Sequence, residues 1–371
     1  MVFRLPSASD AALPARAAMR PATATHAVSY PLFDWLRFVL ASVVALGHGK
    51  VIDWPDAGFL AVQVFLALSG WLIGGILLET GRADLPRFFF NRATRIWIPY
   101  AIAILLLYSV SALRDPVNAR WLEFLAYDAT FTHNLYSLKP DAATALPLMP
   151  LQGTGNHFWS ISVEEQFYLL APLVMLFTPL GKSLKLWLPI SAFMVLTGGW
   201  FGAISLGVSA AIARRDFGDW HLPWRPAFAG VAVVTFALII TPGMPMRQIA
   251  PVFAIAVILL LAVEGPRSRL GLVAGGLSYP LYLNHWIPVF AVHFVLARAG
   301  LETSDLWETL AWLLAVLGSA LHFLLIDRNI QRHRGRIFTP ALGRSLGLAA
   351  YGLLLLGITL GTLSRGLPFW G

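Results

Sequence analysis

The sequence predicts an all-α fold: a polytopic bundle of about 10–11 transmembrane helices whose N-terminus is cytoplasmic. Composition is the first indication, because 57% of the 371 residues are hydrophobic and only 12% are charged, against about 25% charged in soluble domains. Apolar runs near the length of a membrane crossing recur along the chain. Lysine and arginine fall in short stretches between these runs, so membrane topology explains the net charge of +8 better than nucleic-acid binding does.

Eleven apolar segments bounded by charged or turn residues are candidate spans, because a hydrocarbon core about 30 Å thick needs roughly 20 helical residues. The fifth and sixth are short, and Gly198-Gly199 between them is either a turn or a kink in one longer span. The segments are 31–50, 59–78, 96–113, 157–180, 186–200, 201–213, 224–241, 248–263, 273–297, 306–326 and 341–362.

The distribution of positive charge predicts the orientation. With the N-terminus inside, 19 of the 27 Lys and Arg residues lie in cytoplasmic segments, seven lie outside, and Arg37 lies within a span. Residues 1–29 are rich in Ala and Pro and lack the apolar core of a signal peptide, so we expect a flexible cytoplasmic tail. The chain has no cysteine, which excludes a disulfide framework and a cysteine nucleophile.

The longest predicted loop, 114–156, falls on the outer side. It mixes aromatic, polar and proline residues, among them Trp121, His133 and Asn134. Its length suits a lid or an acceptor surface, and a plain tether between two spans is the alternative.

The first span carries Asp34, Arg37 and His48. Eleven residues separate Arg37 from His48, close to three helical turns, which places both on one face about 16 Å apart. His48 lies between two glycines at the outer end, and imidazole is well suited to take a proton from an alcohol near neutral pH. The alternative is an Asp34–Arg37 ion pair at the inner headgroups with His48 as an interfacial capping residue.

The fourth span contains the adjacent carboxylates Glu164 and Glu165. Neighbouring helical positions point about 100° apart, so one carboxylate at most faces a given partner. We expect one of them to face His48 and to orient its imidazole. Structural pairing with an arginine is the alternative.

Two further polar groups are candidates for a site. Arg92 and Arg95 are one turn apart at the inner side and can hold phosphate or pyrophosphate, although positive-inside anchoring also predicts arginines there. In the ninth span Tyr279, Tyr282 and His285 follow one another at three-residue steps and form a polar stripe. A packed, hydrogen-bonded stripe without a catalytic role is the alternative for these three.

These motifs, in this order, resemble those of the acyltransferase 3 family of integral-membrane O-acyltransferases over residues 31 to 330. They are Arg-x10-His at Arg37 and His48, the V-Q-V-F-L-A-L-S-G segment at 62–70, Arg-x-x-Arg at Arg92 and Arg95, the W-S-x-x-V-E-E-Q-F-Y block at 159–168, and S-Y-x-x-Y-L-x-H at 278–285. Two positions depart from the family. Gln63 replaces a frequent Asp, and Asp327-Arg328 stands where relatives often have Glu-Arg/Lys-Pro.

The resemblance implies that His48 is the catalytic histidine, that Arg37 and Glu164 belong to the same functional core, and that Arg92 and Arg95 bind acyl-CoA. Substrate-contacting residues are expected among Asp34, Ser69, Trp159, Tyr279, Tyr282 and His285. The implied organisation is a tail at 1–29, an acyltransferase-3-like transmembrane domain at 30–330 with the outer loop 114–156, and a cytoplasmic basic loop plus a final transmembrane helix at 331–371.

The function implied is transfer of a short acyl group, acetyl by default, from cytoplasmic acyl-CoA to a hydroxyl of an extracytoplasmic or membrane-associated carbohydrate. We expect no metal and no nucleic acid, membrane lipid as the surroundings, and the bacterial cytoplasmic (inner) membrane as the location. The sequence indicates no oligomeric state. Either His48 acts as general base or it carries the acyl group as an acyl-histidine. A transporter or flippase of a lipid-linked saccharide and a catalytically silent scaffold are the alternatives.

Overall fold

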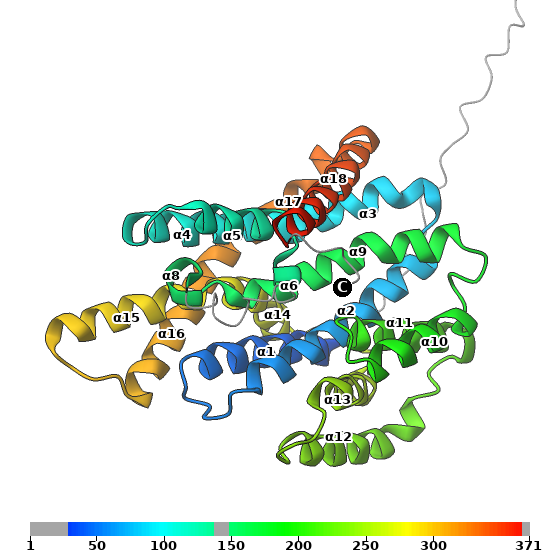
Figure 1. Ribbon diagram of the computed structural model, residues 1–371. Helices are drawn as coiled ribbons and strands as arrows, with labels where there is room; N and C mark the ends of the chain where they lie inside the picture. The colour runs from blue at the N-terminus through cyan, green and yellow to red at the C-terminus, as the bar shows by residue number, and fades with distance from the viewer. Residues whose placement is uncertain (1–28, 137–147, 366–371) are drawn as a thin grey trace, which may run out of the picture.

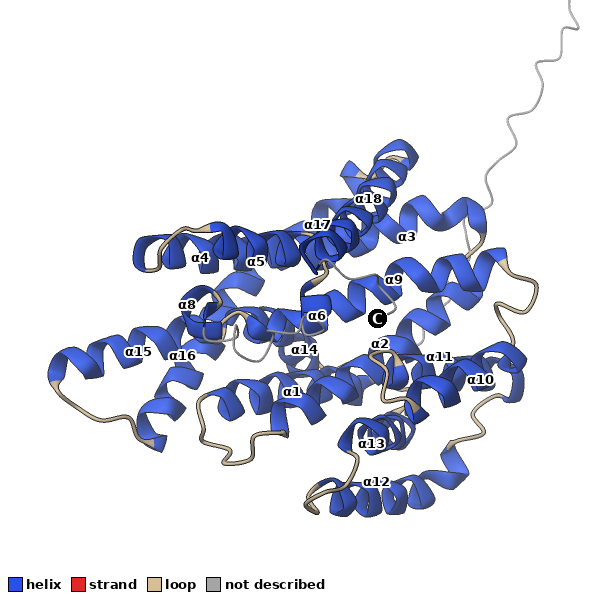
Figure 2. Ribbon diagram, viewed as in Figure 1, coloured by secondary structure: helices blue, strands red, loops and turns tan. Residues whose placement is uncertain are grey.

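The computed structural model describes residues 29–136 and 148–365, and all regular structure in these residues is helical (Figure 2). The predicted all-α fold is therefore confirmed. The helices are α1 Pro31–His48, α2 Ala57–Glu79, α3 Leu85–Arg92, α4 Ile98–Arg114, α5 Ala119–Ala129, α6 His133–Tyr136, α8 Pro150–Gly153, α9 Trp159–Phe177, α10 Leu184–Leu196, α11 Gly202–Phe217, α12 Arg225–Ile239, α13 Met246–Leu261, α14 Arg269–Asn284, α15 Trp286–Ala299, α16 Asp305–His322, α17 Arg328–Ile337 and α18 Pro340–Arg365.

Each of the eleven predicted apolar segments contains a helix, and the chain is a multi-pass membrane protein. Within the described residues, seven helical stretches are long and apolar enough to cross a membrane, and the bent pair α14–α15 would be an eighth. Helices α10 and α13 are shorter apolar helices. Gly198 has a φ of +66°, in the left-handed region that glycine adopts readily, so 186–213 forms two helices separated by a turn.

Helices α2 and α11 lie side by side (Figure 1), and their backbones approach closely at two glycines. A Cβ atom added to Gly70 would lie 1.9 Å from the carbonyl oxygen of Ile204, and one added to Gly207 would lie 2.2 Å from that of Ala67. Only glycine fits at such distances, and small residues commonly allow helices to approach closely in membranes. Gly70, the last residue of the 62–70 motif, thus allows α2 to pack closely against α11.

Two prolines explain the irregular helices near the polar residues. Pro288 has no N–H to donate to the carbonyl of Asn284, and the chain bends by 55° between α14 and α15. His285 lies at this break. Pro99 likewise leaves the carbonyl of Arg95 without its usual donor, and residues Ala93–Trp97 form a π-helical turn that carries Arg95.

The predicted loop 114–156 contains α5, α6 and α8, while part of it, residues 137–147, lies outside the described residues. The side chain of Asn118 caps α5 by accepting a hydrogen bond from the backbone N–H of Trp121 at 3.0 Å. Phe124, Tyr127 and Asp128 on this helix are buried. In its described part this segment therefore packs into the protein as an ordered element, and the lid and tether interpretations stay predictions.

Candidate active site

A cavity of about 470 Å³ lies at the end of α1 that carries His48. Its volume is within the range of small-molecule sites, about 300–1,000 Å³. The wall combines histidines and other polar groups with aromatic rings. It is formed by Val44, Gly47, His48, Pro55, Gly58, Phe59, Val62, His133, Asn134, Tyr136, Met149, Asn156, His157, Trp159, Trp200, Arg247 and Tyr282.

His48 forms a pair with His285, which comes from the break between α14 and α15. The Nδ1 atom of His48 lies 2.8 Å from Nε2 of His285, and the two rings stack with centroids 5.0 Å apart. The other ring nitrogen of His285, Nδ1, lies 2.9 Å from the carbonyl oxygen of Tyr282. Carbonyls in the last turn of a helix lack intrahelical donors, which makes this oxygen available to the imidazole.

These contacts determine where the protons lie when both rings are neutral. A carbonyl oxygen only accepts, so Nδ1 of His285 carries the proton and its Nε2 accepts. Nδ1 of His48 must then be the donor in the pair, which leaves a lone pair on Nε2 of His48. This nitrogen is near Gly58, where an added Cβ would be 3.9 Å away, and both residues line the cavity. The imidazole therefore presents a proton acceptor to the cavity.

Tyr282 connects the histidine pair to helix α9. Its hydroxyl lies 2.5 Å from the hydroxyl of Ser160 and donates to the carbonyl oxygen of His157 at 2.9 Å. The His157 ring stands 4.9 Å from that of His285, centroid to centroid. Tyr279, in contrast, does not line the cavity, and its hydroxyl donates to the carbonyl oxygen of Ile96 at 3.2 Å.

The expected contact between Glu164 and His48 is not formed. Glu164 accepts hydrogen bonds from the hydroxyls of Ser69 and Tyr168. It lies seven residues beyond His157 in the sequence, about 10 Å farther along a helix, so its carboxylate is too deep to reach the imidazoles. The neighbouring Glu165 accepts from the indole N–H of Trp97 at 2.6 Å.

The predicted arginines gather with Glu164, away from the end of α1 that carries His48. The charge of Arg95 interacts with those of Arg37, Arg92 and Glu164. The guanidinium of Arg92 lies over the ring of Tyr168 at 5.0 Å. This part of the structure thus brings together Arg37, Ser69 and Glu164 with the Arg-x-x-Arg pair, although they lie far apart in the sequence.

Asp34 pairs with Arg37 at 3.6 Å, as the spacing of three residues suggested. It also pairs with Arg267, whose Nη2 donates a hydrogen bond to Oδ1 at 3.1 Å and whose Nε lies 2.9 Å from Oδ2 in an ion pair. Arg267 is a partner that the sequence did not reveal, because 233 residues separate it from Asp34.

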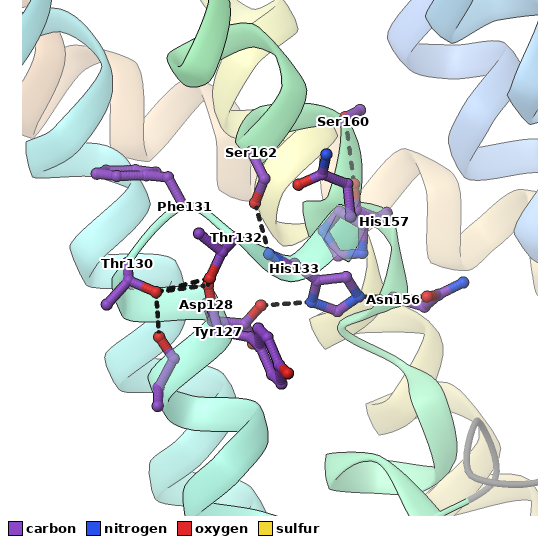
Figure 3. Close-up of polar contacts among 12 residues, drawn as sticks. Tyr127, Asp128, Thr130, Phe131, Thr132, His133, Asn156, His157, Ser160 and Ser162 are labelled. Atoms are coloured by element: carbon purple, nitrogen blue, oxygen red, sulfur yellow. Dashed lines mark hydrogen bonds and ion pairs between the residues drawn. The ribbon is translucent and has the colours of Figure 1, made fainter. Parts of the chain in front are cut away.

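A second histidine group, formed around Asp128 and His133, was also missed (Figure 3). The Asp128 Oδ1 atom lies 2.5 Å from Nδ1 of His133, and Oδ2 accepts from the hydroxyl of Tyr108 at 2.6 Å. Nε2 of His133 points toward Oδ1 of Asn156 at 3.3 Å. Burial lowers the pKa of His133, but the Asp128 carboxylate and these hydrogen bonds outweigh it and raise the pKa above its usual value. The one signal in the sequence for this pair was an Asp five residues before a His.

Together, the multi-pass helical fold and the cavity lined by His48, whose imidazole pairs with His285, define a membrane-embedded protein with a candidate acid–base site. The family model of the acyltransferase 3 family, described as an acyltransferase domain, matches residues 30–326. The chain belongs to the acyltransferase 3 family and is a membrane acyltransferase.

The relatives have matching descriptions. A putative membrane-bound transacylase, BcsY, of Komagataeibacter xylinus is 25% identical over 360 residues, which cover 88% of each chain. The O-acetyltransferase OatA of Staphylococcus aureus (strain NCTC 8325 / PS 47) is 30% identical over 154 residues, or 40% of this chain and 25% of that protein. A putative O-acetyltransferase of S. aureus strain COL is 28% identical over 39% of this chain and 24% of its own length. The chain thus matches about a quarter of the length of these S. aureus proteins. No solved structure matches the chain.

Proposed function

We propose that the protein transfers a short acyl group, acetyl by default, from cytoplasmic acyl-CoA to a hydroxyl of a carbohydrate on the outer side of the bacterial cytoplasmic membrane. The observation that carries this proposal is the free Nε2 lone pair of His48 on the wall of a cavity. It gives an acceptor hydroxyl a base within reach. The predicted topology, with an inside N-terminus, puts this cavity on the outer side.

His48 would act as general base. Its Nε2 takes the hydroxyl proton while the hydroxyl oxygen attacks the thioester carbonyl, and the carbon–sulfur bond breaks as the CoA thiolate leaves. The proton then passes from His48 to the thiolate, which restores the neutral ring. His285 supports the step because its Nε2 accepts a hydrogen bond from Nδ1–H of His48, which keeps the basic Nε2 of His48 directed at the cavity.

The donor would be held by Arg37, Arg92 and Arg95. Guanidinium groups pair well with phosphates, and with the N-terminus inside, these three would be on the side from which acyl-CoA would enter. Glu164, with Ser69 and Tyr168, lies beside this group and balances part of its charge. In this proposal Glu164 orders the donor site rather than the imidazole.

The acceptor would lie against the aromatic part of the cavity wall. Phe59 and Trp159 stack with centroids 6.1 Å apart, and Trp159 packs against Trp200 at 5.2 Å. Flat aromatic surfaces suit the apolar C–H face of a sugar ring, while the polar lining can bond its hydroxyls. The proposed acceptor is therefore a saccharide.

The test is a CoA-release assay on purified protein in nanodiscs, with acetyl-CoA and an extract of membrane glycans. Wild-type protein should release CoA in a glycan-dependent manner, and His48→Ala should lower the rate by about 10²–10⁴-fold. Arg298→Gln is a matched control, because Arg298 stacks on Phe294 at 5.1 Å and does not line the cavity. Glycan-independent rates, or equal rates for wild type and His48→Ala, would contradict the proposal. A labelled acyl adduct that accumulates without glycan and needs His48 would replace direct transfer by an acyl-histidine relay.

A further inference from the structure

The described wall of the outer cavity contains one arginine and no carboxylate. Of its lining residues, Arg247 is cationic, three more are histidines, and none is an aspartate or a glutamate. Although burial lowers the pKa of His133, the Asp128 carboxylate beside it raises that pKa above its usual value. Asp53 and Asp56 lie in the loop between α1 and α2, but neither lines the cavity. The cavity is therefore complementary to an anionic ligand.

Arg247 is placed to contact such a ligand. Its guanidinium lies 5.4 Å from the centre of the Trp200 ring, which supports it from one side. It takes part in no ion pair among the described residues, so its N–H donors are available to a bound group.

The position of Arg247 in its helix adds to this preference. It is in the first turn of α13, and the N-cap residue, Pro245, gives no side-chain hydrogen bond to the helix. The partial positive charge at a helix N-terminus adds to the charge of the guanidinium there.

Arg247 also lies at the end of the row of aromatic rings in the cavity wall. Phe59, Trp159 and Trp200 follow one another at ring separations of 6.1 and 5.2 Å, and Arg247 covers the last ring. A sugar ring lying on Trp159 would therefore place a substituent near Arg247. The bidentate geometry of a guanidinium suits a carboxylate or a phosphate at that position.

We propose that the acceptor is an acidic saccharide, whose carboxylate or phosphate pairs with Arg247 while its sugar ring packs on Trp159 and Trp200. This inference rests on the proposed function and specifies the class of its acceptor. An anionic group could also come from the acyl donor, as the distal carboxylate of a succinyl group. The proposal assigns it to the acceptor.

The test compares two acceptors that differ in one group: an oligosaccharide containing glucuronic acid, and the same oligosaccharide after reduction of its carboxyl groups to primary alcohols. With purified protein and acetyl-CoA, wild type should acetylate the acidic form with a kcat/KM at least tenfold higher. Arg247→Gln should raise KM for the acidic form about 10- to 100-fold, the range for hydrogen bonds to charged groups, and leave the reduced form unaffected. Arg247→Lys should retain part of the preference, and Arg298→Gln should retain all of it.

Equal use of the two oligosaccharides by wild type would overturn the inference. So would an Arg247→Gln defect that appears with succinyl-CoA and not with acetyl-CoA, because the anion would then belong to the acyl group. Either result leaves glycan-dependent CoA release intact. Absence of CoA release with both oligosaccharides and with the membrane glycan extract would instead contradict the proposed function itself.

Discussion

The pairing of His48 with His285 gives a quantitative prediction. Replacing His285 with alanine removes the acceptor that lies 2.8 Å from Nδ1 of His48. One such hydrogen bond contributes about 1–1.5 kcal/mol, and 1.4 kcal/mol corresponds to about tenfold in rate. We therefore expect kcat to fall about tenfold. KM for acyl-CoA should stay within about twofold, because the arginines proposed to hold the donor are elsewhere in the bundle.

The assay is steady-state CoA release with the acyl-CoA and acceptor concentrations varied separately. His285→Gln keeps an acceptor oxygen on the side chain and should recover part of the lost kcat. His333→Ala, which changes an exposed histidine on α17, is the control for loss of an imidazole elsewhere. Unfolding temperatures of all variants separate a catalytic effect from a folding defect. An unchanged kcat in His285→Ala, or equal values for the Ala and Gln variants, would refute the proposed orientation of His48.

Three further outcomes follow from the packing and the charges. Gly58→Ala places a methyl 3.9 Å from Nε2 of His48 and should raise KM for the acceptor. It should preserve the unfolding temperature, because alanine favours a helix over glycine by about 0.5–1 kcal/mol. An unchanged KM would contradict this prediction. Gly70→Ala drives a methyl into the Ile204 carbonyl and should lower the unfolding temperature by the equivalent of about 1–3 kcal/mol. Coinciding thermal melting curves of the wild type and the variant would disprove this. The raised pKa of His133 implies that its pair with Asp128 stabilises the fold fully below about pH 6.5 and loses this contribution as pH rises through the raised pKa. Asp128→Asn should flatten the pH dependence of the unfolding temperature in that window, and an identical slope in the variant would exclude this pair as its source.

Much of the architecture could be predicted because the bilayer imposes a length and a polarity on each crossing. The apolar runs located the helices, and the glycines at 198 and 199 marked the place where two short ones separate. The three-residue spacing of Asp34 and Arg37 was enough to predict their contact, since it depends on one helix alone. Orientation and the domain division stay predictions.

Contacts between distant helices could not be predicted from spacing. Glu164 was expected beside His48, but its depth along α9 places it with Ser69 and Tyr168. The true partner of His48 is 237 residues away and lies at a helix break that depends on Pro288. The Asp128–His133 pair lies in a segment treated as a loop, where no helical period was available to relate the two residues. Polar partners of this kind follow from tertiary packing.

The glycine contact between α2 and α11 bears on how a reaction could occur across the bilayer. Because the main chains of α2 and α11 touch at Gly70 and Gly207, sliding of one helix past the other would bring their backbones into collision. Rocking of one half of the helical bundle against the other, as a carrier requires, would have to preserve this contact between α2 and α11. In the proposed transfer, the extended acyl arm of the donor would reach the cavity without such a rearrangement of the helices.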